Sequence, residues 1–545
     1  MAELSYAQGI AKLPLLGQTI SQSLSSAVAA HAEREALVVR HQGVRLTYAE
    51  LGEQVDRLAC GLHALGLRKG DRLGIWAPNC AEWVLVQFAT ARLGVILVNV
   101  NPAYRSTELG FALRHSGCRM LVAAPAFKGS DYRAMVAEVR GDLDELEHAV
   151  FLESPEWAAL IDGSAPDVQW PELDFDDPIN IQYTSGTTGS PKGATLSHHN
   201  ILNNGFFVGE ACGYTQEDRV CIPVPFYHCF GMVMGNLGCV THGACMVVPA
   251  PAFEPGAVLE TVAGEGCTSL YGVPTMFIAE LEHADFDSFD LSSLRTGIMA
   301  GSPCPEEVMR KVIDRMHMDG VTICYGMTET SPVSTQTASD DELDRRVGTV
   351  GRVHPHVEVK IVEPESGRTV ELGAPGELCT RGYSVMLGYW EDRERTEEAI
   401  DRARWMHTGD LATMDEEGFV KIVGRSKDMI IRGGENVYPG EIEEFLFSHP
   451  AIREAAVYGV PDPRYGEAVM ASVILREGER LSEEELQAHC KDKIAHYKIP
   501  RHVRFVSEFP LTVTGKVQKF LLREAAIELL AENESFGPSP GTTDG

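Results

Sequence analysis

The chain carries, from residue 183 to residue 193, the polar stretch Tyr183-Thr184-Ser185-Gly186-Thr187-Thr188-Gly189-Ser190-Pro191-Lys192-Gly193. It follows the apolar residues 179–183 and precedes Ala194-Thr195-Leu196-Ser197-His198. Glycine lets the backbone turn tightly and approach a ligand closely, hydroxyls donate hydrogen bonds, and Lys192 adds a positive charge. These groups suit a polyphosphate, so the stretch predicts a phosphate-binding loop.

The spacing of this loop differs from that of a Walker A motif. In that motif Gly-x4-Gly-Lys is followed by Ser or Thr, whereas Lys192 lies between Pro191 and Gly193. A different class of nucleotide site is therefore indicated. A loop rich in Gly, Ser and Thr is by itself more often a flexible surface turn, so its function depends on what else the chain carries.

Length and charge limit the class of protein. The 545 residues are enough for more than one domain, and 44% hydrophobic residues support large buried cores. The net charge of −31 repels nucleic acid and anionic membrane surfaces, and also ATP and CoA. We therefore expect small-molecule partners and no nucleic acid, with any anionic ligand held by local groups.

The cysteines and the N-terminus indicate a compartment. The 13 cysteines form no Cys-x-x-Cys pair and no zinc spacing with His, which predicts scattered reduced thiols. The segment 1–25 contains a single Lys and no Arg, and no apolar run in the chain is long enough to suggest a membrane-spanning helix. We expect a cytoplasmic protein without integral membrane association. The oligomeric state stays open, with a homodimer among the candidates.

Strand and helix signals alternate along most of the chain. A capping box at Thr47-Tyr48-Ala49-Glu50 precedes apolar residues at helical spacing up to Leu65. Strands predicted at 72–76 and 94–100, with a helix between them, indicate a βαβ unit and a parallel sheet. Residues 1–45 read as an irregular arm.

Two changes in the secondary-structure pattern along the sequence suggest the domain organisation. Short β-like segments after residue 347 predict a small barrel, and Gly424-Arg425-Ser426-Lys427-Asp428 marks a boundary. The fold class is therefore predicted as α/β, with a large N-terminal domain (1–424) of two parallel-type α/β subdomains plus the small barrel. A smaller α+β domain is predicted at 425–545, with a disordered tail at 532–545.

Several motifs follow the loop in order along the chain: Ala300-Gly301-Ser302-Pro303-Cys304-Pro305, Tyr325-Gly326-Met327-Thr328-Glu329, Trp405-Met406-His407-Thr408-Gly409-Asp410 and Pro510-Leu511-Thr512-Val513-Thr514-Gly515-Lys516. Together they resemble the adenylate-forming superfamily, which includes acyl-CoA synthetases, luciferases and peptide-synthetase adenylation domains. The resemblance extends from about Leu46 to Lys516. Two runs make it most similar to medium-chain fatty acyl-CoA synthetases: Ser197-His198-His199-Asn200 and Pro225-Phe226-Tyr227-His228-Cys229.

The resemblance implies an ATP site with Mg²⁺. Glu329 is similar to the family's magnesium-binding carboxylate, with Thr184 as a second metal contact, and Thr328 to its donor to the α-phosphate. Asp410 would accept the ribose hydroxyls, and Arg425 would be a second ribose or phosphate contact. The remaining residues that resemble nucleotide contacts are Ser185, Gly186, Thr187, Thr188, Gly189 and Lys192 in the loop, and Gly301, Ser302, Tyr325 and Gly326 elsewhere.

The same resemblance implies a second domain that moves. Lys516 matches the family's adenylation lysine, which bridges the carboxylate and the α-phosphate, so its domain must close over the loop. Lys427 occupies the hinge position. The resemblance assigns the binding of CoA to Arg432, Gly433 and Gly434. It assigns His228 to positioning and gating near the reacting groups.

Apolar residues around His228 suggest the nature of the acid. The predicted pocket residues are Phe226, His228, Phe230, Met232, Val233, Gly326 and Met327. Each buried methylene contributes about 0.8 kcal/mol, so such walls favour a hydrocarbon tail over acetate.

The combined prediction is an ATP-dependent acyl-CoA synthetase. It would form an acyl-AMP from a medium-chain fatty acid and transfer the acyl group to CoA, releasing AMP and pyrophosphate. Two alternatives stay open. One is the same fold acting on an aryl or short thioether acid or loading a carrier-protein thiol, and the other is a non-catalytic nucleotide or acyl-CoA sensor.

Overall fold

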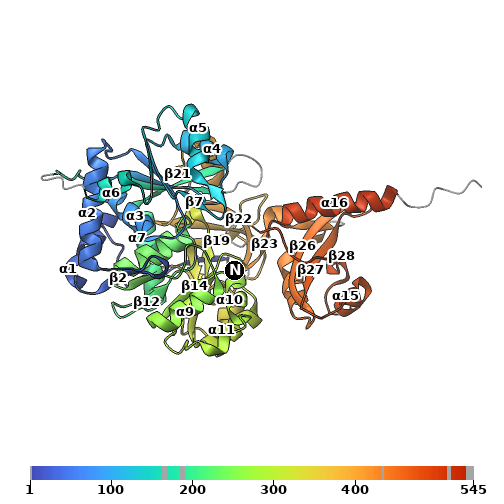
Figure 1. Ribbon diagram of the computed structural model, residues 1–545. Coiled ribbons are helices and arrows are strands. Elements are labelled where there is room, and N and C mark those ends of the chain that lie inside the picture. The colour runs from blue at the N-terminus through green and yellow to red at the C-terminus, as the bar shows by residue number, and fades with distance from the viewer. Residues whose placement is uncertain are drawn as a thin grey trace, which may run out of the picture.

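The computed structural model describes residues 3–162, 168–184, 191–302, 304–432, 435–491, 493–511 and 517–535. Figure 1 shows a larger part, coloured blue to light orange, beside a smaller orange-red C-terminal part. Helices and strands alternate from Ile20 to Gln336, whereas most strands after that point belong to antiparallel sheets. The predicted fold class is confirmed.

A seven-stranded sheet contains the two strands that flank the predicted phosphate-binding loop. Its central strands pair in parallel, as expected when each crossover contains a helix, and two antiparallel strands complete one edge. In spatial order the strands are β21 (Gly388–Tyr389), β11 (Lys192–Ser197), β10 (Pro178–Thr184), β5 (Ile96–Asn99), β4 (Arg72–Trp76), β6 (Met120–Ala123) and β9 (His148–Phe151).

A nine-stranded sheet forms the second α/β layer. Six neighbouring strands from β16 to β2 are parallel, and the edges are antiparallel. The order is β18 (Arg352–Val353), β17 (Val333–Gln336), β16 (Gly320–Gly326), β15 (Thr296–Ala300), β14 (Ser269–Gly272), β12 (Arg219–Cys221), β13 (Cys245–Val248), β2 (Glu35–Val39) and β3 (Val44–Thr47). Strand β12 is short, because the chain leaves the sheet after Cys221.

Helices cover these sheets, and their starts follow the local sequence. Helix α2 (Tyr48–Ala64) begins at the predicted capping box, in which the side chains of Thr47 and Glu50 each accept from the other's backbone N–H. The other helices of the larger part are α1 (Ile20–His31), α3 (Ala81–Leu93), α4 (Ser106–Ser116), α5 (Tyr132–Val139), α6 (Pro155–Ile161), α7 (His198–Ala211), η3 (Phe230–Leu237), α8 (Gly238–His242), α9 (Pro255–Glu265), α10 (Pro274–Leu281), α11 (Glu306–Met316), α12 (Leu343–Gly348) and α13 (Arg393–Ala399).

Helix α1 corrects the prediction of an irregular N-terminal arm. The segment is rich in Ser and Ala, so its periodic signal is weak. Ile20, Leu24 and Ala27 nevertheless lie one turn apart and are buried, and Thr19 caps the helix. Tertiary packing of this narrow apolar face therefore decides the helix.

The predicted small barrel is a five-stranded antiparallel sheet. Its order is β1 (Tyr6–Gln8), β19 (Val357–Val362), β20 (Gly376–Gly382), β22 (Met406–Met414) and β23 (Val420–Arg425). Strand β1 adds the N-terminus to an edge that is distant in the sequence, through pairs such as Ala7 with Val359. A two-stranded ribbon of β7 (Ala126–Phe127) and β8 (Ser130–Asp131) completes the larger part.

The C-terminal part is a second sheet with its own core. Its strands are β24 (Ile430–Arg432), β25 (Glu435–Val437), β26 (Ile452–Asp462), β27 (Gly466–Leu475) and β28 (His502–Phe505). The helices are α14 (Pro439–Phe447), α15 (Glu483–Cys490) and α16 (Lys519–Ser535). Helix α16 extends to Ser535, and the rest of the predicted tail, residues 536–545, lies outside the described residues.

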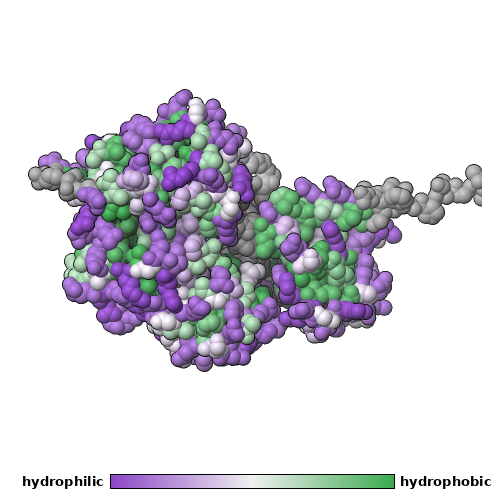
Figure 2. All heavy atoms as spheres, viewed as in Figure 1, coloured by the Kyte–Doolittle hydropathy of each residue, from purple (hydrophilic) through white to green (hydrophobic). Residues whose placement is uncertain are grey.

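Hydrophobic residues reach the surface of both parts. Figure 2 shows them among hydrophilic residues on the viewed face of the larger part and in patches on the C-terminal part. Exposed large hydrophobic residues of that part include Ile431, Phe505, Leu511, Phe520, Leu521 and Leu529. No helix within the described ranges is both long and apolar enough to cross a bilayer.

Candidate active site

The antiparallel strands β10 and β11 lie on either side of the predicted phosphate-binding loop in the sequence. Thr184 ends one strand and Lys192 begins the other, and the two residues are register partners. Gly193 follows Lys192 in a crowded position, because a Cβ there would lie 3.0 Å from Ile181 Cγ2. Five predicted loop contacts lie outside the described residues, namely Ser185, Gly186, Thr187, Thr188 and Gly189.

Glu329 lies where the two α/β layers meet and is held from two sides. It is 5% exposed, and its Oε1 accepts a hydrogen bond from the Tyr389 hydroxyl at 2.9 Å and another from Thr184 Oγ1 at 3.4 Å. The Lys192 ammonium lies 5.0 Å from the centre of the Tyr389 ring. The cluster therefore places a carboxylate, a threonine hydroxyl and a cation at the open end of the hairpin.

Tyr389 is a site residue that sequence reasoning missed. It is on β21, which pairs with β11, so the sheet carries it to the hairpin from a distant part of the chain. Burial, and then the Glu329 carboxylate, raise the pKa of its hydroxyl, so it stays a donor. A Gly-Tyr-Trp run is a weak signal by itself, and only the strand pairing shows its role.

The stretch from Tyr325 to Glu329 joins this cluster to a second group of polar side chains. Tyr325 donates from its hydroxyl to Asp410 Oδ2 at 2.6 Å, and Arg425 Nε donates to Asp410 Oδ1 at 3.2 Å. Asp410 and Arg425 are register partners on β22 and β23. The predicted ribose contacts thus meet at one edge of the antiparallel sheet.

Gly326 between these groups has no room for a side chain. A Cβ would lie 1.7 Å from the carbonyl oxygen of Pro332. Strand β16 ends here, and a short 3₁₀ turn, η5 (Thr328–Thr330), then turns Thr328 and Glu329 into the site. Thr328 Oγ1 lies 3.9 Å from the sulfur of Cys229, which brings the predicted α-phosphate donor beside the His228 segment.

The predicted nucleotide contacts Gly301 and Ser302 follow the neighbouring parallel strand. Strand β15 ends at Ala300, and Gly301 then adopts φ +93°, a left-handed conformation that favours glycine. Gly301 is exposed and Ser302 is half-buried. Because β15 and β16 are parallel neighbours, these residues and Tyr325 emerge at the same edge.

His228 follows a turn rather than a strand. Its Nδ1 accepts from the backbone N–H of Phe230 at 3.2 Å, so the ring is oriented by its own loop. The apolar residues after it belong to a π-helix, η3, in the main core. Phe226 packs against Trp83 with ring centres 5.6 Å apart, and Met232 sulfur accepts from Gln182. Their role as walls of an acid pocket stays a prediction.

The predicted hinge and CoA residues lie after the last strand of the antiparallel sheet. Strand β23 ends at Arg425, and Lys427 lies in the 3₁₀ turn η6 (Ser426–Asp428). Arg432 donates to the carbonyl of Tyr497 at 2.7 Å within the C-terminal part. Gly433, Gly434 and Lys516 lie outside the described residues.

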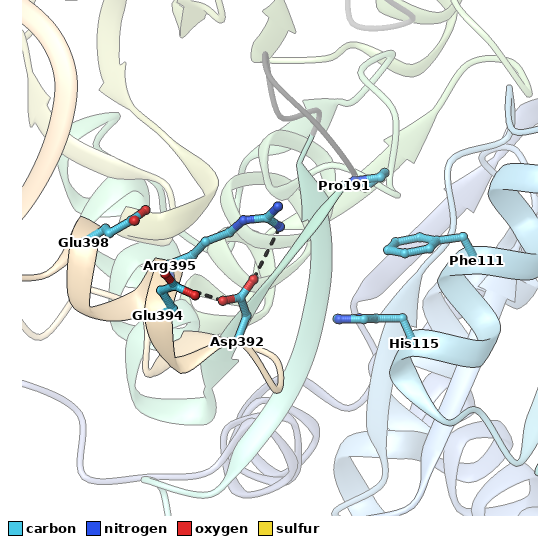
Figure 3. Close-up of a pocket in the computed structure, with 7 residues that line it drawn as sticks. All are labelled: Phe111, His115, Pro191, Asp392, Glu394, Arg395 and Glu398. Carbon is cyan, nitrogen blue, oxygen red and sulfur yellow. Dashed lines mark hydrogen bonds and ion pairs between the residues drawn. The ribbon is translucent and has the colours of Figure 1, made fainter.

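A separate pocket of about 450 Å³ flanks the far end of the loop (Figure 3). Phe111 and His115 on α4 face it from one side, and α13 faces it from the other. Its charged lining is Asp392, Glu394, Arg395 and Glu398. With three carboxylates against one guanidinium, this pocket does not suit a phosphate anion.

Comparison with known proteins identifies the family. The model of the AMP-binding enzyme family matches residues 24–390, and that of the AMP-binding enzyme C-terminal domain matches residues 441–516. The chain belongs to the AMP-binding enzyme family. The predicted resemblance to adenylate-forming enzymes is thereby confirmed.

Relatives of this AMP-binding enzyme cover nearly its whole length. It is 46% identical to the medium-chain acyl-CoA ligase ACSF2, mitochondrial, of Bos taurus, over 95% of this chain and 89% of that protein. The anthranilate CoA ligase AuaEII in complex with anthranoyl-AMP has a TM-score of 0.87 at 29% identity, covering 95% of this chain and 99% of that one. ATP-bound MatB from Rhodopseudomonas palustris has a TM-score of 0.85 at 28% identity, with 94% and 100% covered.

Proposed function

We propose that the protein is an AMP-forming acyl-CoA synthetase whose acid substrates are medium-chain fatty acids. In the first half-reaction a carboxylate oxygen attacks the α-phosphorus of ATP, and the bond to pyrophosphate breaks. In the second, the CoA thiol attacks the acyl carbon and AMP leaves. Near-full-length similarity to a medium-chain acyl-CoA ligase and to structures with ATP or an acyl-AMP supports this reaction.

One observation carries the proposal. The stretch 325–329 joins Asp410 and Arg425 at one end to Thr184 and Glu329 at the other. A nucleotide lying along this stretch would meet a carboxylate suited to two ribose hydroxyls and, farther on, oxygen ligands suited to a hard cation. Glu329 and Thr184 would hold Mg²⁺, which neutralises phosphate charge as the anionic groups approach.

The acid and the moving domain are further parts of the proposal. A medium-length chain is favoured because the residues after His228 are apolar and because ACSF2 is named for such acids. Residues 425–545 would form the mobile domain, hinged at Lys427, that brings Lys516 to the α-phosphate and then withdraws it. The exposed hydrophobic residues of that part support a surface that packs differently in two orientations.

Two assays test the reaction. Pyrophosphate release and CoA-dependent AMP formation would be measured with acids from acetate to palmitate and with benzoate. We expect a maximum at medium chain length and a fall of at least a hundredfold in pyrophosphate release for Lys516→Ala. The exposed Lys493 in the same part of the chain provides the control variant Lys493→Ala, which should keep full activity.

Each contrary result points to a stated alternative. Release of pyrophosphate with no CoA-dependent AMP formation would favour a carrier-protein thiol as acceptor. If no acid gave pyrophosphate release, the assignment as an enzyme would be wrong and a sensor would be favoured. If benzoate gave the highest rate, the assignment of fatty acids as substrates would be wrong. A cytoplasmic location and a homodimer also belong to the proposal, and cell fractionation and light scattering of the purified chain would test them.

A further inference from the structure

A second cluster of ligating side chains lies on the antiparallel sheet. Glu377 and Cys379 are on β20 and His407 is on β22, and Cys379 and His407 are register partners. One ligand atom of each residue lies within 4.8 Å of the others. His407 Nδ1 lies 2.9 Å from Glu377 Oε2 and 3.5 Å from Cys379 Sγ.

These separations are close to those around a tetrahedral zinc ion. Zinc bonds of about 2.0–2.3 Å to nitrogen, oxygen and sulfur place the ligand atoms roughly 3.4–3.6 Å from one another. The sulfur-to-nitrogen distance already fits, and a small rotation of the Glu377 carboxylate would adjust the other two. A thiolate with an imidazole selects zinc-like ions over Mg²⁺, which prefers oxygen ligands.

The surroundings of the cluster provide outer support and access. The backbone N–H of Gly409 donates to Glu377 Oε1 at 3.1 Å, which leaves Oε2 directed to the cluster. Asp401 Oδ2 lies 4.0 Å from His407 Nε2, the ring nitrogen that faces away from Cys379. In metal-bound histidines, the ring N–H that does not bind the metal commonly donates a hydrogen bond to such a carboxylate. Cys379 is buried, but the His407 side chain is 32% exposed, so an ion can enter past it.

The number of ligands sets an upper limit on affinity, because three protein side chains make up the cluster. We expect binding weaker than that of a structural four-ligand zinc site, with the fourth position open to water.

We propose that Glu377, Cys379 and His407 bind one zinc-like divalent ion, at a site separate from the Mg²⁺ position at Glu329. Asp401 would orient His407 from outside without touching the ion. The proposal does not depend on ligase activity, because the three ligands belong to one sheet and need no nucleotide.

Cobalt(II) is the probe for the test, because a thiolate–cobalt bond gives a charge-transfer absorption band. The full chain, without an affinity tag and in excess Mg²⁺, would be titrated with Co²⁺ and then with Zn²⁺. We expect one equivalent of Co²⁺ to produce the band, one equivalent of Zn²⁺ to abolish it, and Zn²⁺ to raise the unfolding temperature.

Variants separate this site from the other thiols. Cys379→Ser and His407→Gln should remove the band, whereas Cys304→Ser and Cys60→Ser, at partly exposed cysteines outside the cluster, should keep it. Asp401→Asn should weaken Co²⁺ binding by roughly 10- to 100-fold without removing the band. Absence of the band in the wild type, or its persistence in Cys379→Ser, would overturn the proposal. If Cys379→Ser does not fold, persistence of the Co²⁺ charge-transfer band in His407→Gln would also overturn the proposal.

Discussion

Glu280 on α10 is a buried carboxyl group that we expect to make the stability of the larger part depend on pH. Its side chain is 0% exposed, and neither carboxyl oxygen has a hydrogen-bond partner among the described residues. Burial raises the pKa of Glu280 well above its ordinary value of 4.5. As the pH rises above 4.5, the folded protein therefore keeps a proton that the unfolded chain releases.

The sign and size of the effect follow from proton linkage. Since the folded-state pKa is raised, the stability is fully present below pH 4.5 and is lost as the pH rises. While the folded protein keeps the proton, the loss is about 1.4 kcal/mol per pH unit, or about 3 kcal/mol between pH 5 and pH 7. The side chain introduced by Glu280→Gln does not titrate. The free energy of unfolding of this variant, relative to the wild type, should therefore rise by about 3 kcal/mol between pH 5 and pH 7.

Denaturant unfolding at pH 5, 6 and 7 would measure this difference. The control variant is Glu282→Gln, two residues along at an exposed position, which should change stability by less than about 0.5 kcal/mol at every pH. A difference between Glu280→Gln and the wild type that is the same at pH 5 and pH 7 would refute the reasoning. It would mean that Glu280 is ionised, or that it titrates alike in both states.

Three further predictions concern the site. Tyr389→Phe removes the hydroxyl that donates to the Glu329 carboxylate, and a hydrogen bond to a charged group contributes about 1.5–3 kcal/mol. We therefore expect kcat/KM for ATP to fall roughly 10- to 100-fold, with the largest fall at low Mg²⁺. An unchanged Mg²⁺ dependence of pyrophosphate release would contradict this prediction. Asp410→Asn replaces charge-assisted acceptors by a neutral amide, so the KM for ATP should rise roughly tenfold with little change in kcat, measured from initial rates. Gly326→Ala places a methyl group 1.7 Å from the carbonyl oxygen of Pro332. We expect thermal unfolding to show a loss of stability of more than about 3 kcal/mol. An unfolding temperature equal to that of the wild type would contradict this prediction and would show that the backbone can relax.

Local sequence was enough to predict the elements that hold the site. The capping box at Thr47 starts α2, and the strands predicted at 72–76 and 94–100 are the parallel neighbours β4 and β5. These predictions succeeded because helix caps and short apolar runs between turns depend on residues near in the chain. The order of the motifs predicted the family, which the comparisons confirmed.

What the sequence by itself determined is the capped start of α2, the strand–helix–strand alternation that makes an α/β protein, and the motifs of an AMP-binding enzyme. Only the tertiary structure decided that α1 is a helix, that β1 joins a sheet at β19, and that Tyr389 supports Glu329. It also decided that Glu377, Cys379 and His407 meet although they show no zinc spacing. The physical reason is that sheet register and packing bring together residues that are far apart in the chain, and no local pattern encodes such pairings.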